Sequence, residues 1–223
     1  MDLKQSVKAR HSVRSYTNQP LEKNVISALN AAIAEINAQN ELNVQLVTEE
    51  PNAFGKSFLA HYGKFSGVKN YFALAGKKSK KLEEKLGYYG EKLVLLAQTL
   101  NLNTCWVYLT YNKHKCPITI EKGEKLVAVI AIGYGKNQGV EHKNKPLDKV
   151  CEFDGKTPAW FLEGVMCALQ APTAINQQKF FFSQEDGVVT VKKGVGPCSK
   201  IDLGIVKYHF EIGAGTQNFK WKE

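Results

Sequence analysis

The spacing of apolar residues along the first two thirds of the chain predicts an alternation of helices and strands. Helical stripes show apolar residues three or four apart, whereas the strand segments either alternate or are apolar throughout. The expected elements are, in order, a helix over Pro20–Ala38, strands over 42–48 and 70–76, a long helix that begins in the charge-rich stretch 77–85 and ends at 101–103, and strands over 104–110 and 124–135.

The last third predicts the same kinds of element again. Thr157-Pro158 begins a helix that reaches Gln170, the aromatic run 180–182 starts a hairpin that turns at Asp186-Gly187, and a last helix runs from near Asp202 to Gly213. Helix followed by strand thus occurs at 20–48 and at 157–183. A glycine, an apolar helix and a tryptophan also recur, from Gly90 to Trp106 and from Gly204 to Trp221. Two related halves are one explanation, and chance similarity between helices is the other.

Composition and charge narrow the class of protein. The chain has 223 residues, of which 43% are hydrophobic and 23% charged, a balance typical of a folded globular protein. This length favours one domain, with two small ones as the alternative. Thirty Lys and Arg against 21 Asp and Glu give a net charge of +9. Such a surplus favours anionic partners, although surface solubility explains it equally well.

The sequence predicts no membrane segment, metal site or disulfide framework. MDLKQSVKARHS lacks the apolar core of a signal peptide, and the longest apolar run, 126–134, is too short to span a bilayer. The five cysteines form no CxxC pair, so we expect free thiols in a reducing cytoplasm. The histidines are scattered without metal-binding spacing, at His11, His61, His114, His142 and His209.

Two basic segments are candidates for binding a phosphate. ARHSVRSY, residues 9–16, places Arg10 and Arg14 around a serine, and arginine presents a planar fork that suits phosphate oxygens. HKNK, residues 142–145, adds two lysines. An ordinary basic surface is the alternative for both. The glycine-rich GYGKNQG, residues 133–139, lacks the spacing of a phosphate-binding loop and is interpreted as a turn.

The segment APTAINQQKFFF, residues 171–182, places a polar loop between a helix and a strand. Pro172 ends the helix, and the loop carries one threonine and three side-chain amides that both donate and accept hydrogen bonds. These groups serve either a turn or the recognition of a planar polar ligand. The loop alone leaves both possibilities open.

Together these segments resemble the nitroreductase family, flavoproteins that bind FMN. The resemblance rests on ARHSVRSY, on GYYGEKLVLLAQTLNLNTCW, on VAVIAIGYGK with the following HKNKPL, and on APTAINQQKFFF, which matches the family's Pro-Ser-Ala-x-Asn-x-Gln loop. It implies an α+β fold, an α/β sandwich with a central mixed or antiparallel sheet flanked by helices and an internal pseudo-twofold repeat.

The resemblance also assigns roles to individual residues. It implies that the FMN phosphate, ribityl chain and pyrimidine end are bound by Arg10, His11, Ser12 and Arg14. Further positive charge at the phosphate would come from Lys143 and Lys145. It also implies that the isoalloxazine ring and its polar edge are lined by Pro172, Thr173, Ala174, Asn176 and Gln178. The loop after Trp106, with Tyr108, Leu109 and Thr110, should lie over the flavin, although the family usually has a glycine pair where this chain has Val107 to Thr110.

The order of the motifs departs from the family. There the amide-rich loop follows the first long helix, but residues 37–43 of this chain show no match, and the loop appears only after the second-half helix. The resemblance implies the architecture of an intertwined homodimer, in which FMN lies at the interface and the partner subunit donates this loop. We therefore expect residues 1–223 to form one intertwined domain with half-repeats at about 1–150 and 151–223. The chain should be a monomeric pseudo-dimer that binds one FMN, and an additional dimer formed through its surface is the alternative.

The resemblance implies an FMN-dependent NAD(P)H oxidoreductase that passes hydride through flavin to a nitroaromatic, quinone or flavin acceptor. No catalytic side chain is expected, because flavin carries the chemistry. A flavin-binding module with little turnover, for storage or sensing, is the alternative. A nucleic-acid-binding protein ranks third, because the chain has no recognisable binding motif. Partners are therefore expected to be small molecules. Tyr108, Tyr111, Phe65 and Tyr71 either stack on an acceptor or belong to the core.

Overall fold

The chain divides into two compact units that alternate along the sequence. The computed structural model describes residues 1–54 and 64–222, so His61 lies outside the described residues. One unit consists of Met1–Ala9, Glu83–Glu91 and Glu141 onward, and the other of Arg10–Leu82 and Lys92–Val140. They are called the C-terminal unit and the N-terminal unit below.

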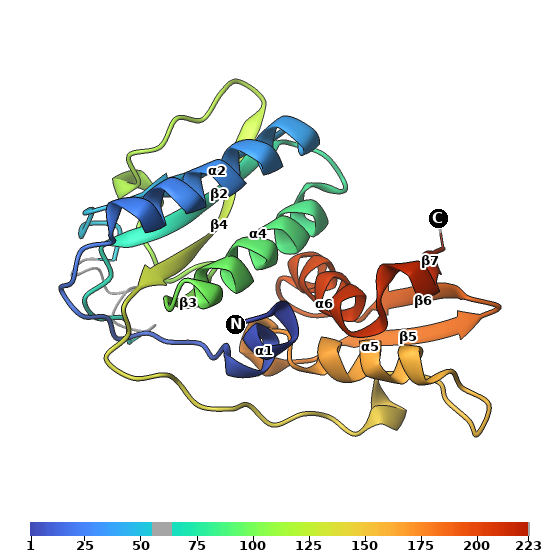
Figure 1. Cartoon of the computed structure of the whole chain (residues 1–223). Helices are drawn as coiled ribbons and strands as arrows, with labels where there is room; N and C mark the ends of the chain where they lie inside the picture. Colours follow the sequence, from blue (N-terminus) through green and yellow to red (C-terminus); the bar gives the residue numbers. More distant parts are fainter. Residues whose placement is uncertain (55–63, 223) are drawn as a thin grey trace. The chain divides into compact units, whose positions relative to one another are not determined.

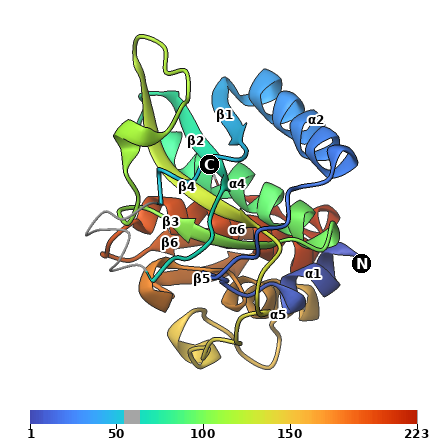
Figure 2. The same ribbon diagram turned by 90° about the vertical axis from the view of Figure 1, so that its left-hand side faces the viewer.

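The N-terminal unit is built on a four-stranded antiparallel sheet in the order β1-β2-β4-β3, of which β2, β4 and β3 are labelled in Figure 1. The two inner strands are almost entirely apolar because neighbouring strands flank both their edges and packed layers cover both faces. β1 is an edge strand beside the helix α2 (Figure 2). The elements are α2 (Lys23–Asn40), β1 (Leu42–Val47), β2 (Asn70–Lys77), α4 (Leu82–Thr99, of which residues 83–91 belong to the other unit), β3 (Asn103–Val107), the short 3₁₀ turn η1 (Lys113–Lys115) and β4 (Glu124–Gly133).

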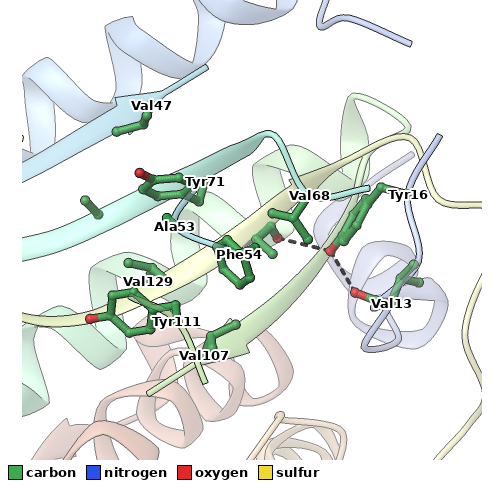
Figure 3. Packing of buried hydrophobic residues seen from close by; sticks show 12 residues of the cluster. Val13, Tyr16, Val47, Ala53, Phe54, Val68, Tyr71, Val107, Tyr111 and Val129 are labelled. Atoms are coloured by element: carbon green, nitrogen blue, oxygen red, sulfur yellow. Dashed lines mark hydrogen bonds between the residues drawn. The ribbon is translucent and has the colours of Figure 1, made fainter. Parts of the chain in front are cut away.

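One face of this sheet carries a layer of aromatic and aliphatic side chains (Figure 3). Phe54 lies among Tyr71 and Tyr111, with ring centroids 5.8 and 6.3 Å away. The Tyr16 hydroxyl donates to the carbonyl oxygens of Val13, at 2.7 Å, and of Ala131, at 3.3 Å. Tyr71 and Tyr111 therefore belong to the core, which is one of the two alternatives that the sequence left open for them. Phe65 packs against this layer, and Tyr108 is exposed.

The C-terminal unit combines helices with a three-stranded sheet in the order β5-β6-β7. β5 and β6 form the predicted hairpin, whose turn residues Asp186 and Gly187 both have positive φ, as a type I′ turn requires. β7 pairs with β6 in parallel. The elements are α1 (Leu3–Ala9), η2 (Leu147–Lys149), α5 (Ala159–Leu169), η3 (Ala174–Asn176), β5 (Phe180–Glu185), β6 (Val188–Lys193), α6 (Ser199–Ala214), η4 (Thr216–Asn218) and β7 (Lys220–Trp221).

An aromatic cluster forms the core of the C-terminal unit. The rings of Phe182 and Phe210 stack with their centroids 4.7 Å apart, and Phe161, Phe219 and Trp221 pack around Phe210. These side chains come from the helices α5 and α6, from both edge strands of the small sheet and, for Phe219, from the residue between η4 and β7, so the cluster connects the helices to the sheet. Aromatic pairs of this kind add stability beyond the area that they bury.

The helices α4 and α6 cross at two glycines. A Cβ added at Gly87 of α4 would lie 2.1 Å from the carbonyl oxygen of Ile201, and one added at Gly204 of α6 would lie 2.0 Å from that of Glu84. Each helix therefore presents a bare backbone to the other. The contact is reciprocal, because each glycine is the sixth residue of its helix and meets the third residue of the other.

The same order of elements appears in both halves of the chain. Helix, strand, strand, helix, strand describes α2-β1-β2-α4-β3 and again α5-β5-β6-α6-β7. In each half the first two strands are antiparallel and the last strand runs parallel to the second. The second half lacks a counterpart of β4 between its last two strands. Two related halves and a twofold axis between them both stay predictions.

Element boundaries differ from the sequence expectations by a few residues in either direction. The charge-rich stretch begins with Lys77 as the last residue of β2, and α4 begins only at Leu82, the first buried residue after Lys77. Pro158 occupies the position before α5 instead of its first turn, and α6 begins at Ser199. β3 ends at Val107, where its pairing with β4 stops. The short helix α1 was not expected, because seven residues give too little periodicity to recognise.

Candidate functional site

The amide-rich loop connects α5 to β5 and has a strained backbone. Ile175, Asn176 and Gln178 have φ values of 49°, 54° and 42°, in the left-handed region that non-glycine residues rarely adopt. Ile175 is β-branched, which makes this conformation least favourable, and its apolar side chain is 88% exposed. Strain of this kind persists only where surrounding contacts impose it, and it is concentrated at ligand-binding and active sites.

One group of contacts holds the loop from within the C-terminal unit. The Gln178 amide N–H donates to the Thr173 hydroxyl oxygen at 3.0 Å. The Ala174 N–H donates to the Asp202 carboxylate, with distances of 3.1 and 3.2 Å to its two oxygens. Gln177 Nε2 donates to the same carboxylate at 2.6 Å and to the Pro197 carbonyl at 2.7 Å.

A second group of contacts joins the loop to the basic segment HKNK. The side-chain amides of Asn176 and Gln178 both donate to the Lys143 carbonyl oxygen, at 2.9 and 2.8 Å. Lys145 donates through its backbone N–H to Gln178 Oε1, at 2.8 Å, and through its ammonium to the Gln178 carbonyl, at 3.0 Å. The structure therefore brings together two segments that the sequence separates by about thirty residues. Gln178 is buried, whereas Asn176 and Lys143 are exposed.

The arginine-containing segment lies in the N-terminal unit and is anchored at both ends. Val13 and Tyr16 are buried in the sheet layer, and the Val13 N–H donates to the Thr104 carbonyl at 3.0 Å. Arg14, between these anchors, is exposed, whereas Arg10 is buried. Ser12 forms a bridge with Thr104 in β3. Burial raises the pKa of the Cys105 thiol, and this effect outweighs the lowering by Arg14, Ser12 and Arg10 of the segment.

The glycine-rich turn 133–139 packs against the same segment. Gly139 has a φ of 74°, and a Cβ there would lie 2.6 Å from the His11 Cβ, so only glycine fits. Asn103 in β3 holds the turn by accepting from the Gly135 N–H at 3.0 Å and donating to Gln138 Oε1 at 3.0 Å. Within GYGKNQG, Gly133 ends β4, Gly135 forms a bridge with Tyr16, and the chain bends at 136–137.

The loop after β3 carries the other predicted residues of the N-terminal unit. Tyr108 and Leu109 are 42% and 68% exposed, and Thr110 is half-buried. Tyr111 then returns to the core. The loop thus presents two large side chains at its surface, in the segment where the family usually has a glycine pair.

Two residues that position these segments carry no signal in the sequence. Asp202 and Asn103 are polar and buried, and each bonds to a loop far away in the chain. Burial raises the pKa of the Asp202 carboxyl from 3.8 to about 6, against the opposing effect of its hydrogen bonds from Gln177 and Ala174. A carboxylate kept in so costly a position indicates a specific role.

Across residues 1–54 and 64–222, no cluster of three or more His, Cys, Asp or Glu could hold a metal ion. No helix in this part of the chain is long and apolar enough to cross a membrane. All five cysteines are described, and all are free.

The chain belongs to the family described as "Putative TM nitroreductase", whose model matches residues 2–214. The mixed α+β fold described above agrees with this assignment, and the resemblance found in the sequence is confirmed. No curated protein sequence matches the chain significantly.

Solved structures show the same fold at low sequence identity. A "putative nitroreductase" from Thermotoga maritima is similar with a TM-score of 0.67 and 18% identity, over 96% of this chain and 83% of that chain. A "putative nitroreductase in complex with FMN" from Desulfovibrio desulfuricans has a TM-score of 0.52 and 16% identity, over 66% and 94%. A "Putative NADH dehydrogenase/NAD(P)H nitroreductase" from Bacteroides thetaiotaomicron has a TM-score of 0.52 and 15% identity, over 67% and 96%.

Each unit by itself exposes cationic and apolar side chains in these segments. In the N-terminal unit they are Arg14, Tyr108 and Leu109, and in the C-terminal unit Lys143 and Ile175. Cationic side chains suit a phosphate group.

Proposed function

We propose that this protein is an FMN-dependent NAD(P)H oxidoreductase of the nitroreductase type. The observation that carries the proposal is the strained loop 173–178, because it coincides with the segment to which the family resemblance assigns the flavin ring. Membership of the family and the FMN complex of the Desulfovibrio neighbour support the choice of cofactor. The naming of the Bacteroides neighbour supports a nicotinamide co-substrate.

The proposed roles follow the character of each segment. Arg10, His11, Ser12 and Arg14 bind the phosphate and ribityl end, with Lys143 and Lys145 adding positive charge. The loop residues Pro172, Thr173, Ala174, Asn176 and Gln178 shape the surface that faces the ring; Gln178, being buried, acts by holding that surface in place. Bound FMN supplies two-electron hydride transfer, so this chain need only bind, orient and shield it.

The acceptor is proposed to be a small oxidised aromatic compound: a nitroaromatic, a quinone or a free flavin. These compounds are flat and largely apolar, and the exposed side chains of Tyr108 and Leu109 offer a surface of matching character. We place the protein in a reducing compartment such as the cytoplasm, because its five cysteines are free.

A flavin-binding module with little turnover is the competing function. It is favoured by one observation: bulky side chains at positions 108 and 109 replace the glycine pair typical of the family and can cover the face of the ring. Replacing both by glycine should then increase acceptor reduction, whereas in an efficient oxidoreductase the change should leave turnover equal or lower.

The absorption spectrum of the purified protein, loaded with FMN and then mixed with NADH or NADPH under nitrogen, tests the proposal. A yellow protein that bleaches with either nucleotide and regains its colour on adding a quinone or nitroaromatic supports the oxidoreductase. A protein that stays yellow is a binding module. A colourless protein that takes up no FMN rules out both functions.

The chain is further proposed to complete its flavin site without a second copy, as a pseudo-dimeric monomer. Residues 37–43 form the end of α2 and the start of β1 with only Glu41 between them, so no counterpart of the loop follows the first long helix. Chains carrying Arg10→Ala and Arg14→Ala can be unfolded and refolded together with chains carrying Asn176→Ala and Gln178→Ala. No recovery of FMN binding is expected, and recovery would mean that two chains share a site.

A further inference from the structure

A single buried carboxylate lies under the strained loop. Asp202 is in the first turn of α6 and is 7% exposed. Its two oxygens accept from the Ala174 N–H, and one of them also accepts from Gln177 Nε2 at 2.6 Å. These two donors lie on either side of Ile175 and Asn176, whose φ values are positive. The carboxylate therefore fixes both ends of the strained turn.

The orientation of the Gln177 side chain depends on this carboxylate. Nε2 has two hydrogens, and it gives one to Asp202 and the other to the Pro197 carbonyl. Oε1 has no hydrogen-bond partner among the described residues and lies 2.1 Å from where a Cβ on Gly196 would be. Turning the amide over would place an oxygen against two acceptors. The side chain thus leaves one acceptor unsatisfied in order to keep its bond to Asp202.

We propose that Asp202 is a positioning residue for the loop 173–178, holding the left-handed backbone in the form that contacts the flavin. The proposal rests on the flavin-binding function proposed above and adds a residue to it. A carboxylate suits this task better than an amide, because it accepts from both donors at once and offers no hydrogen to repel them. The N-terminal turn of α6 also favours a negative charge.

The surroundings of Asp202 make its charge sensitive to mildly acid pH. Burial raises the pKa of its carboxyl to about 6. The neighbouring titratable group on α6 is the Cys198 thiol, whose pKa is about 11 because of burial, with Asp202 and then Glu83 of α4 adding to the rise. The thiol stays neutral when Asp202 titrates. The loop 173–178 and residues 194–197 contribute no titratable side chain. Protonating Asp202 removes the charge from its bonds to the loop.

Two measurements on the full chain test the assignment. The first is hydrogen exchange at the Ala174 amide in the protein without flavin, which reports on the loop alone. In Asp202→Asn we expect exchange at this amide to be about tenfold faster or more, with amides of the aromatic cluster unchanged. Asp148→Asn removes the same charge from an exposed site in the same unit and should behave as the wild type.

The second measurement is riboflavin affinity between pH 5 and pH 8, since riboflavin has no phosphate that titrates in this range. Wild type should bind more weakly below pH 6, whereas Asp202→Asn should bind about tenfold more weakly at pH 8 and show little pH dependence. Asp202→Glu should recover part of the affinity. Gln177→Leu provides a second variant, with a faster Ala174 exchange and weaker binding, if Asp202→Asn does not fold.

The outcomes separate the positioning role from the proposed function. Equal Ala174 exchange in wild type and in the variants would overturn the positioning role, as would faster exchange with unchanged riboflavin affinity. If wild type binds no flavin at any pH, the proposed function fails, and with it the flavin part of this assignment. Faster Ala174 exchange, weaker riboflavin binding and loss of the pH dependence in Asp202→Asn together support the positioning role of Asp202.

Discussion

The reciprocal crossing of α4 and α6 allows a quantitative prediction for Gly204→Ala. A Cβ at this position would lie 2.0 Å from the Glu84 carbonyl oxygen and 2.5 Å from the Tyr88 nitrogen. Real Cβ atoms essentially never approach other atoms closer than 3.0 Å, so the helices must separate locally by about 1.0 Å. Both clashing atoms are backbone, and no change of rotamer can relieve them.

Two effects of opposite sign compete in this variant. Alanine in a helix interior is more favourable than glycine by about 1 kcal/mol. Overpacking typically costs about 1–3 kcal/mol, and a clash between two backbones belongs at the upper end. We therefore expect a net destabilisation of about 2 kcal/mol. Gly87→Ala, which meets the Ile201 carbonyl at 2.1 Å, should cost a similar amount.

The assay is urea unfolding followed by tryptophan fluorescence, to which Trp221 in the aromatic cluster contributes. Gly155→Ala is the matched control, because a Cβ there meets nothing within 4 Å and should change stability by less than about 0.5 kcal/mol. The double variant Gly87→Ala/Gly204→Ala should cost less than the sum of the two, since the first substitution already separates the helices. A Gly204→Ala protein as stable as the wild type would refute the reasoning.

The remaining predictions concern flavin contacts and the buried carboxylate. Arg10→Ala and Arg14→Ala should each weaken FMN binding by about 1.5–3 kcal/mol in a titration of the apo-protein, because each removes a charge-assisted contact; unchanged affinity in both would leave the segment a basic surface. Replacing Lys143 and Lys145 together should weaken FMN more than riboflavin, and equal losses would indicate a role in folding instead. The pKa of Asp202 is raised from 3.8 to about 6, so the folded state binds its proton more tightly than the unfolded state does. Rising pH should therefore lower wild-type stability by up to about 3 kcal/mol between about pH 4 and pH 6 relative to Asp202→Asn, measured by urea unfolding at each pH; a constant difference would contradict this.

Much of the fold was predictable because it depends on local patterns. The strands β2 and β4 are recognisable as apolar runs, since both faces of an inner strand are buried. The hairpin turn at Asp186-Gly187 is recognisable because few residues tolerate positive φ at both central positions. Helix starts were less accurate: Leu82 begins α4 because it is buried, and burial is decided by what packs there.

The candidate site was predictable only in its composition. ARHSVRSY, HKNK and the amide-rich loop carry the family resemblance in the sequence itself. Their contacts were not predictable, because a hydrogen bond between Gln178 and Lys145 requires two distant segments to be brought together. The side-chain amides of Asn176 and Gln178 both donate to the Lys143 carbonyl, a contact that the spacing along the chain does not indicate.

The sequence by itself determined the family, the order of helices and strands and the chemical character of the two basic segments and the loop, because periodicity, turn residues and motifs are properties of neighbouring positions. Only the tertiary structure decided which buried groups hold those segments: Asp202 under the loop, Asn103 under the glycine turn, and the glycines at the α4–α6 crossing. An aspartate or a glycine in a helix carries no local mark of the partner it will meet. That partner is set by how the helices and sheets pack, and the free energy of the contact exists only once they have done so.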